Sequence, residues 1–255
     1  MKISRRRALA VSSVPVAALA ALVAGTPSAS AAPARASAPA AAATTTVATT
    51  PASSAASSTL LKAGSRGRAV AAAQRRLAAL GYYIGKVDGV YGSGTVHAVI
   101  ALQKVAGLAR DGVIGPRTSA ALAKGVRPRA RTTRGDVIEV DLARQVLLVV
   151  HSGHVRLIFD VSTGSGAYYY SRGSRHHAVT PKGTYHVFRG VNGWDPGPLG
   201  KLYRPRYFNG GIAVHGYPTV PTTPASHGCV RVTIGVMDYL WSHKLLPIGR
   251  AVVVR

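Results

Sequence analysis

Residues 215–231 read HGYPTVPTTPASHGCVR and hold the only cysteine of the chain, Cys229, close to two histidines. A thiol attacks a carbonyl well only as the thiolate, so a nucleophilic cysteine needs a nearby imidazole that takes its proton. His215, which a glycine follows, has the position of such a base. The stretch therefore predicts a thiol active site with Cys229 as the nucleophile and His215 as the base.

The residues Ser226-His227-Gly228-Cys229 indicate a nucleophile turn. Glycine at position 228 lets the chain bend sharply and brings backbone N–H groups close to a bound carbonyl. We expect the N–H groups of Gly228 and Cys229 to receive the oxyanion, and His227 to orient the site. Arg231 lies two residues beyond the nucleophile. On an extended segment it shares that face, so it is expected to hold a substrate carboxylate or the local loop.

A family resemblance rests on this ordered string. His-Gly, a short proline-bearing loop and Ser-His-Gly-Cys-Val-Arg together resemble the signature of the L,D-transpeptidase catalytic domain, the family that cross-links bacterial peptidoglycan through a cysteine. The resemblance extends to Ser162-Thr163-Gly164 and to TPKGTY at 180–185, and it covers residues 136–255. It implies that the third partner of the site is the backbone carbonyl of Gly216, and that no cofactor or metal takes part.

The same resemblance implies the substrates. The donor is a tetrapeptide stem, cleaved between the L-centre of a diamino acid at position three and the D-Ala at position four. The acceptor is the side-chain amine of another stem, which gives a 3→3 cross-link. With water as the acceptor, the same site is an L,D-carboxypeptidase.

Other functions stay open at this point. A sortase is expected to carry its histidine much farther upstream, and an NlpC/P60-type endopeptidase places its cysteine before its histidine. A zinc site made of His215, His227 and Cys229 is conceivable. From a different class, the chain is a candidate for a non-catalytic wall-binding protein with a relic site.

The charge of the chain indicates anionic partners. It has 32 Lys+Arg against 8 Asp+Glu, a formal net charge of +24, which attracts polyanions. The basic residues are spread along the sequence, and zinc-finger spacing, a bZIP register and an RNP aromatic string are all missing. We therefore expect peptidoglycan and anionic wall polymers as partners, and no nucleic acid.

The first 59 residues contain export signals. Residues 1–31 have a basic start, an Ala/Val/Leu run and a small-x-small site for cleavage after Ala31, which predicts a secretory signal peptide. SRRRAL at 4–9 also resembles a twin-arginine motif. We expect a secreted, wall-associated protein with no stable membrane span after cleavage, an uncleaved anchor being the alternative. Residues 32–59, almost wholly Ala, Ser, Thr and Pro, predict a disordered linker.

Residues 60–125 contain an internal repeat, DGVYGSGT at 88–95 and DGVIGPRT at 111–118. Apolar spacing and glycine stops predict three helices, over residues 67–80, 94–106 and 116–124. The segment resembles the three-helix peptidoglycan-binding domain of cell-wall hydrolases, the alternative being a helical spacer that binds nothing. His97 is expected on the surface, because no companion metal ligand lies at i+3 or i+4.

The remainder predicts a basic linker over 126–135 and a mainly β, sandwich-like catalytic domain over 136–255, so that the fold class is multidomain, all-α followed by mainly β. A helix near 234–243, capped by Thr233, should turn Ile234, Met237 and Trp241 inward. Residues 165–179 and 189–209 are expected to be long polar loops that form lids or binding walls.

Overall fold

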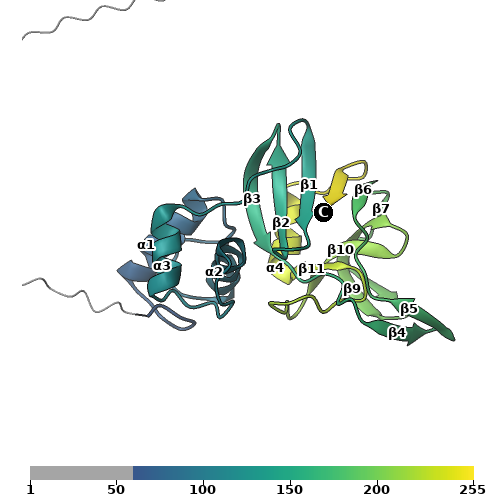
Figure 1. Ribbon diagram of the computed structural model, residues 1–255, viewed down its shortest axis with the longest axis horizontal. Helices are drawn as coiled ribbons and strands as arrows, with labels where there is room; N and C mark the ends of the chain where they lie inside the picture. Colours follow the sequence, from purple (N-terminus) through teal and green to yellow (C-terminus); the bar gives the residue numbers. More distant parts are fainter. Residues whose placement is uncertain (1–59) are drawn as a thin grey trace, which may run out of the picture. The chain divides into compact units, whose positions relative to one another are not determined.

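The computed structural model describes residues 60–255. The expected signal peptide and Ala/Ser/Thr/Pro linker lie outside these residues. Three helices come first, α1 Arg68–Ala79, α2 Ser93–Ala106 and α3 Pro116–Lys124, each within one residue of the range expected from the sequence (Figure 1). Left-handed glycines at 107 and 125 end α2 and α3. None of the helices in residues 60–255 is long and apolar enough to cross a membrane.

The repeat is built around two buried glutamines. The Gln74 amide donates to the Asp88 carboxylate, the Val90 carbonyl and the Thr95 hydroxyl. Gln103 makes the same three contacts one repeat later, to Asp111, Val113 and Thr118. Buried amides need such partners, so each glutamine fixes one Asp-Gly turn to the helix that follows it.

The strands that follow the helices form two five-stranded sheets and a separate hairpin. The first sheet has the order β3-β2-β1-β12-β6, from strands His154–Asp160, Val146–His151, Asp136–Asp141, Ala251–Val254 and Gly183–His186. The second has the order β11-β10-β9-β7, from Val230–Thr233, Ile212–Tyr217, Gly200–Asn209 and Arg189–Gly190, with β8 (Trp194–Gly197) beside β9. A buried cluster drawn from both sheets and from α4 (Ile234–Ser242) fills the space between them, as the expected sandwich requires.

The two segments expected as loops contain strands. Residues 165–179 form the hairpin of β4 (Tyr168–Ser171) and β5 (Ser174–His177), and residues 189–209 hold β7, β8 and β9. Tyr168 stacks on His177, with ring centroids 4.7 Å apart. The hairpin buries little on either face, so it lacks the alternation of apolar and polar residues by which strands are recognised.

The inward face of α4 also differs from the expectation. Val236, Met237 and Leu240 are its buried residues, and Ile234 and Trp241 are only partly buried. The indole N–H of Trp241 donates to the Arg204 carbonyl at 2.8 Å, because a tryptophan at the edge of a core keeps a polar partner.

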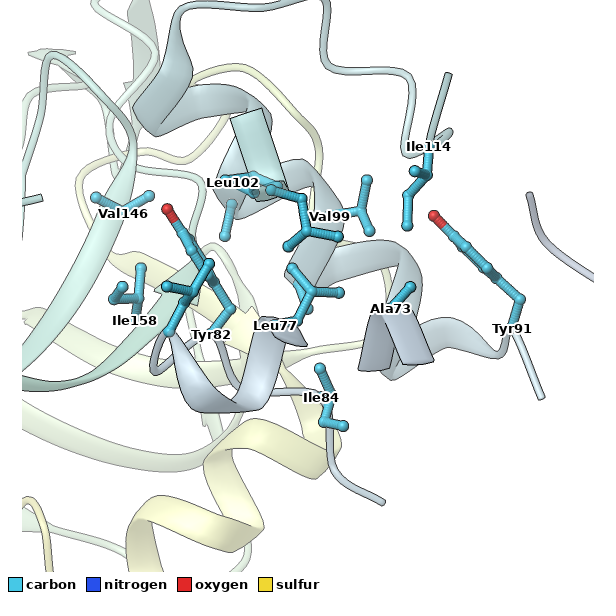
Figure 2. Packing of buried hydrophobic residues seen from close by; sticks show 14 of the residues in the cluster. Ala73, Leu77, Tyr82, Ile84, Tyr91, Val99, Leu102, Ile114, Val146 and Ile158 are labelled. Carbon is cyan, nitrogen blue, oxygen red and sulfur yellow. The ribbon is translucent and has the colours of Figure 1, made fainter. Parts of the chain in front are cut away.

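The helices and the first sheet share one hydrophobic core. Apolar residues of α1 and α2 pack with Val146, Leu148 and Val150 of β2 and with Ile158 of β3. Figure 2 shows Val146 and Ile158 beside the apolar side chains of the helical region. The backbone continues this contact, since the Ile158 N–H donates to Gly81 and the Ile158 carbonyl accepts from Tyr83. The helices and strands of residues 60–255 therefore form one compact unit.

Candidate active site around Cys229

Two parallel strands place Cys229 and His215 on the same side of the second sheet. In the pairing of β10 with β11, Val214 lies opposite Val230 and His215 opposite Arg231. Cys229 directly precedes β11, so it shares the face of Arg231 and lies one diagonal step from His215. The Cys229 thiol also lies 3.7 Å from the carbonyl of Gly211. The register of these two strands thus puts the two candidate residues on one face of the sheet, although a loop separates them in the sequence.

His215 is held as a neutral imidazole. Its side chain is buried, and its Nδ1 lies 2.9 Å from the Gly216 carbonyl. A carbonyl only accepts, so Nδ1 carries the proton and Nε2 is left as the basic nitrogen. The pKa of His215 is lowered to about 4, chiefly by burial and in smaller part by the charge of Arg231, while the bond to the Gly216 carbonyl acts in the opposite direction.

Desolvation raises the pKa of the Cys229 thiol. A hydrogen bond from the Ala213 N–H and the positive charge of Arg231 oppose this shift. Both shifts favour the uncharged form of each group. Cys229 is therefore expected to rest as a thiol, and His215 as a neutral imidazole, at neutral pH.

Ser226 and Gly228 shape the turn in front of the cysteine. The Ser226 hydroxyl donates to the Cys229 carbonyl at 2.6 Å and accepts from the Gly228 N–H at 3.0 Å. Gly228 has φ 142°, and a Cβ there would lie 2.8 Å from the Val179 carbonyl, so only glycine fits. The Gly228 N–H already donates to the Ser226 hydroxyl. It can donate to an oxyanion only if it shares this hydrogen bond or gives it up.

The upstream motifs support this turn from the other side. The Thr180 hydroxyl donates to the Gly228 carbonyl at 2.6 Å and accepts from the Gly164 N–H at 3.0 Å. The carbonyl of Thr163 accepts from both Ala225 and Ser226. Residues 162–164 and 180 therefore brace the nucleophile turn, which explains why these short stretches accompany the cysteine motif.

A groove of about 700 Å³ leads to the cysteine. Besides Cys229 and His227, its walls include Tyr169, Arg189, Asp195 and Tyr207. The Tyr169 ring meets the edge of His227, with centroids 4.5 Å apart. The Asp195 carboxylate accepts from Arg189 at 2.9 Å and from the Tyr207 hydroxyl at 2.8 Å.

These four groove residues were not singled out by the sequence motifs. Their only signal is the concentration of aromatic and basic residues in the segments 165–179 and 189–209.

Arg231 contacts the loop and not the groove. It donates to the Ala225 carbonyl at 3.2 Å, and its guanidinium lies 4.2 Å from the centre of the Tyr217 ring. Of its two expected roles, holding the local loop is the one that these contacts support. No three His, Cys, Asp or Glu side chains of residues 60–255 converge as a metal site requires, so His215, His227 and Cys229 lack the arrangement of zinc ligands.

Comparison with known proteins assigns both parts of the chain. Residues 66–122 match the family described as a putative peptidoglycan binding domain, and residues 135–254 match the L,D-transpeptidase catalytic domain. Among solved structures, the L,D-transpeptidase from Xylanimonas cellulosilytica is 47% identical, with a TM-score of 0.74. The similarity covers 76% of this chain and 97% of that one.

Two curated relatives match shorter stretches. The N-acetylmuramoyl-L-alanine amidase CwlL of Bacillus licheniformis is 46% identical over 80 residues, or 30% of this chain, and the spore cortex-lytic enzyme of Bacillus cereus is 40% identical over 68 residues, or 27% of it. The chain spans only 22% and 26% of the length of these two enzymes. The Xylanimonas structure, in contrast, is matched almost throughout. This chain therefore belongs to the L,D-transpeptidase family, with a helical peptidoglycan-binding region ahead of a mainly β catalytic domain.

Proposed function

We propose that this protein is a cysteine L,D-transpeptidase that joins peptidoglycan stem peptides by 3→3 cross-links through a thioester at Cys229. The observation that carries the proposal is the pairing of β10 with β11. It sets a buried neutral His215 and a groove-lining Cys229 on one face of the sheet.

The reaction has two halves. In the first, Sγ of Cys229 attacks the carbonyl between the diamino acid and D-Ala while Nε2 of His215 takes the thiol proton. The tetrahedral oxyanion is received by backbone N–H groups of the turn, with Cys229 and Gly228 as the proposed donors. The C–N bond then breaks, His215 returns the proton to the departing D-Ala amine, and the stem stays on sulfur as a thioester.

In the second half an amine of another stem attacks the thioester. His215 accepts the amine proton and returns it to the sulfur as the C–S bond breaks, which leaves an amide cross-link and a free thiol. The bond from Nδ1 to the Gly216 carbonyl keeps Nε2 as the nitrogen that gains and returns the proton in both halves. Ser226, His227 and Arg231 position the turn and its surroundings.

The helical region is the proposed contact with the glycan strands. The chain's excess of Lys+Arg over Asp+Glu, 32 against 8, supports a second attraction to anionic wall polymers. These partners and the sequence of residues 1–31 support export, by the twin-arginine or the general route, and residence at the cell wall.

Mass spectrometry of a muropeptide reaction tests the proposal. The full chain, incubated with a disaccharide tetrapeptide, is expected to release D-Ala and to form a 3→3 linked dimer. Cys229→Ala is expected to give neither product. D-Ala release with only a tripeptide product would identify the L,D-carboxypeptidase. No product from a folded chain, at any acceptor concentration, would favour the non-catalytic wall-binding alternative.

A further inference from the structure

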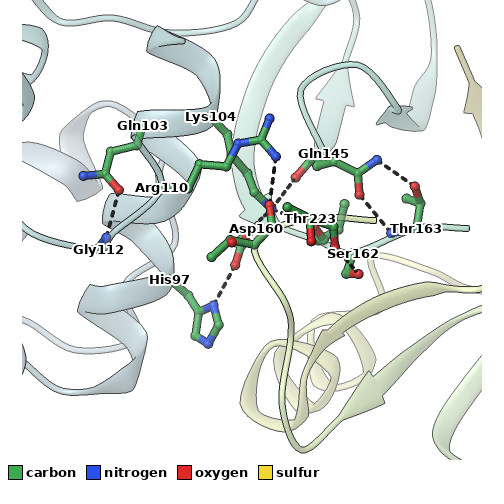
Figure 3. Close-up of polar contacts among 12 residues, drawn as sticks. His97, Gln103, Lys104, Arg110, Gly112, Gln145, Asp160, Ser162, Thr163 and Thr223 are labelled. Carbon is green, nitrogen blue, oxygen red and sulfur yellow. Dashed lines mark hydrogen bonds and ion pairs between the residues drawn. The ribbon is translucent and has the colours of Figure 1, made fainter. Parts of the chain in front are cut away.

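A buried ion pair joins the helical region to the catalytic domain. Lys104 of α2 and Asp160 of β3 have side chains only 0% and 1% exposed, and the ammonium lies 2.5 Å from the carboxylate. The other carboxylate oxygen lies 2.7 Å from Nδ1 of His97, so His97 is a partner of this pair and not the surface residue expected from the sequence. Figure 3 shows these side chains meeting between α2 and the strands.

The ammonium of Lys104 also reaches the backbone beside the nucleophile loop. It donates to the carbonyls of Val161 and Gln145, at 2.8 and 3.3 Å. Buried Gln145 in turn donates to the Thr163 hydroxyl and accepts from the Thr163 N–H. The Thr163 carbonyl holds the N–H groups of Ala225 and Ser226. A continuous series of hydrogen bonds thus runs from α2 to the residues just before Cys229.

A second contact is direct. Arg110 follows α2, and its Nη1 donates to the Thr222 carbonyl at 2.9 Å. Thr222 lies in the proline-rich loop that connects β10, with His215, to Cys229. The next carbonyl of that loop, Thr223, accepts from the Ser162 hydroxyl at 2.8 Å. The loop is therefore held from two sides, by residues before it in the catalytic domain and by an arginine of the helical region.

We propose that Lys104 and Arg110 are positioning residues for the transpeptidase reaction, through which the helical region holds the loop of residues 218–228 and aims Cys229 at its substrate. This inference rests on the function proposed above. The region matched as a binding domain is then also a structural part of the catalytic centre. A loop with three prolines has few backbone N–H donors of its own, so its conformation depends on hydrogen bonds from residues outside the loop. A small displacement of the nucleophile is expected to lower the reaction rate strongly.

Kinetics of Arg110 variants in the full chain test the direct contact. Arg110→Ala is expected to lower kcat for D-Ala release about tenfold, with KM within about twofold, because the loop shifts while the groove stays formed. Arg110→Lys keeps a donor for the Thr222 carbonyl and is expected to recover most of the rate. Arg117→Ala removes the same charge from exposed α3 and serves as the matched control.

Two further measurements separate positioning from mere stability. In Arg110→Ala, hydrogen exchange at the Ala225 and Ser226 amides should accelerate, and the pH profile of Cys229 alkylation by iodoacetamide should shift, while the melting temperature stays near that of Arg117→Ala. If Arg110→Ala equals Arg117→Ala in kcat, amide exchange and alkylation, Arg110 has no positioning role. If the wild-type chain releases no D-Ala, the proposed function fails, while exchange and alkylation still decide whether Arg110 positions the loop.

Lys104 needs a double variant, because removing it alone leaves Asp160 buried without its cation. Lys104→Met with Asp160→Leu replaces the pair by apolar side chains and is expected to remain folded. It removes the donor for the Val161 and Gln145 carbonyls, so faster exchange at Ala225 and Ser226 and a lower kcat are the expected results. A double variant with wild-type exchange and wild-type kcat would overturn the role of Lys104.

Discussion

At the scale of single residues, the site depends on how burial sets the charge of one imidazole. His215 has its pKa lowered to about 4 by desolvation, so its basic nitrogen is free throughout the range in which an ordinary histidine gains a proton. We expect kcat/KM for D-Ala release to keep its value from pH 7 down to about 5 and to fall as the pH approaches 4. An acidic limb near 6.5 in the pH profile would contradict this assignment.

The free energy of unfolding should also depend on pH through His215, and the direction of that dependence follows from its lowered pKa. In the unfolded chain His215 takes up its proton near pH 6.5, and in the folded chain only near 4, so the unfolded state binds more protons between these values. Folding stability contributed by this group is therefore present above pH 6.5 and is lost as the pH falls toward 4. The shift corresponds to a loss on the order of 3 kcal/mol.

Denaturant unfolding of the wild type and of His215→Gln, at pH 7 and pH 4.5, isolates this effect. The glutamine variant should show a smaller decrease, because it has no proton to take up at that position. Equal decreases in the two proteins would exclude the linkage.

At the scale of elements, α4 supports the strand that carries His215. Its N-cap is Thr233, whose hydroxyl accepts from the Val236 N–H at 3.2 Å. Met237 of α4 packs so closely on Gly216 that a Cβ at that glycine would lie 3.2 Å from the Met237 Cβ. Thr233→Ala is expected to cost about 1 kcal/mol of unfolding free energy, and Thr233→Ser to cost much less. Chemical denaturation measures both, and equal losses would show that the hydroxyl cap contributes nothing.

The elements also show what the sequence can and cannot predict. Helical spacing and glycine stops predicted α1 to α3 to within one residue, because apolar residues such as Val70, Ala73 and Leu77 of α1 recur at helical spacing and a glycine follows α2 and α3. The β4–β5 hairpin was not predicted, because its strands are largely polar and little buried on either face. Its cross-strand pairs of tyrosine and histidine become visible only when the chain has folded back on itself.

The contacts of the site also fall into those that the sequence suggests and those that only the fold reveals. Cys229, His215 and the turn between Ser226 and Cys229 lie in one short stretch with a strong local motif, so the sequence alone suggests them as candidates. The partners of His97 and Arg110 are distant in sequence. Asp160 lies 63 positions from His97, and Thr222 lies 112 positions from Arg110. Neither pair has a local pattern, and only the packing of α2 on the sheet brings them together.

At the scale of the whole molecule, the shared core makes the catalytic domain dependent on the helices. A fragment of residues 134–255 would expose Val146, Leu148 and Ile158 to water and leave Asp160 without Lys104. Loss of the ion-pair partner alone is expected to cost about 3–5 kcal/mol. The fragment should melt well below the chain of residues 60–255 and bind a hydrophobic dye, and Asp160→Asn should restore part of the difference. Thermal melting at the same temperature in both would show that the catalytic domain is independent.

The core common to helices and strands also has a geometric consequence. If the helical region binds a glycan strand, Cys229 lies at a fixed distance and direction from the bound sugars, because the helical region and the catalytic domain share one core. The distance between the bound sugars and Cys229 then determines which stems are joined, so cross-linked stems should recur at a preferred spacing along the strand.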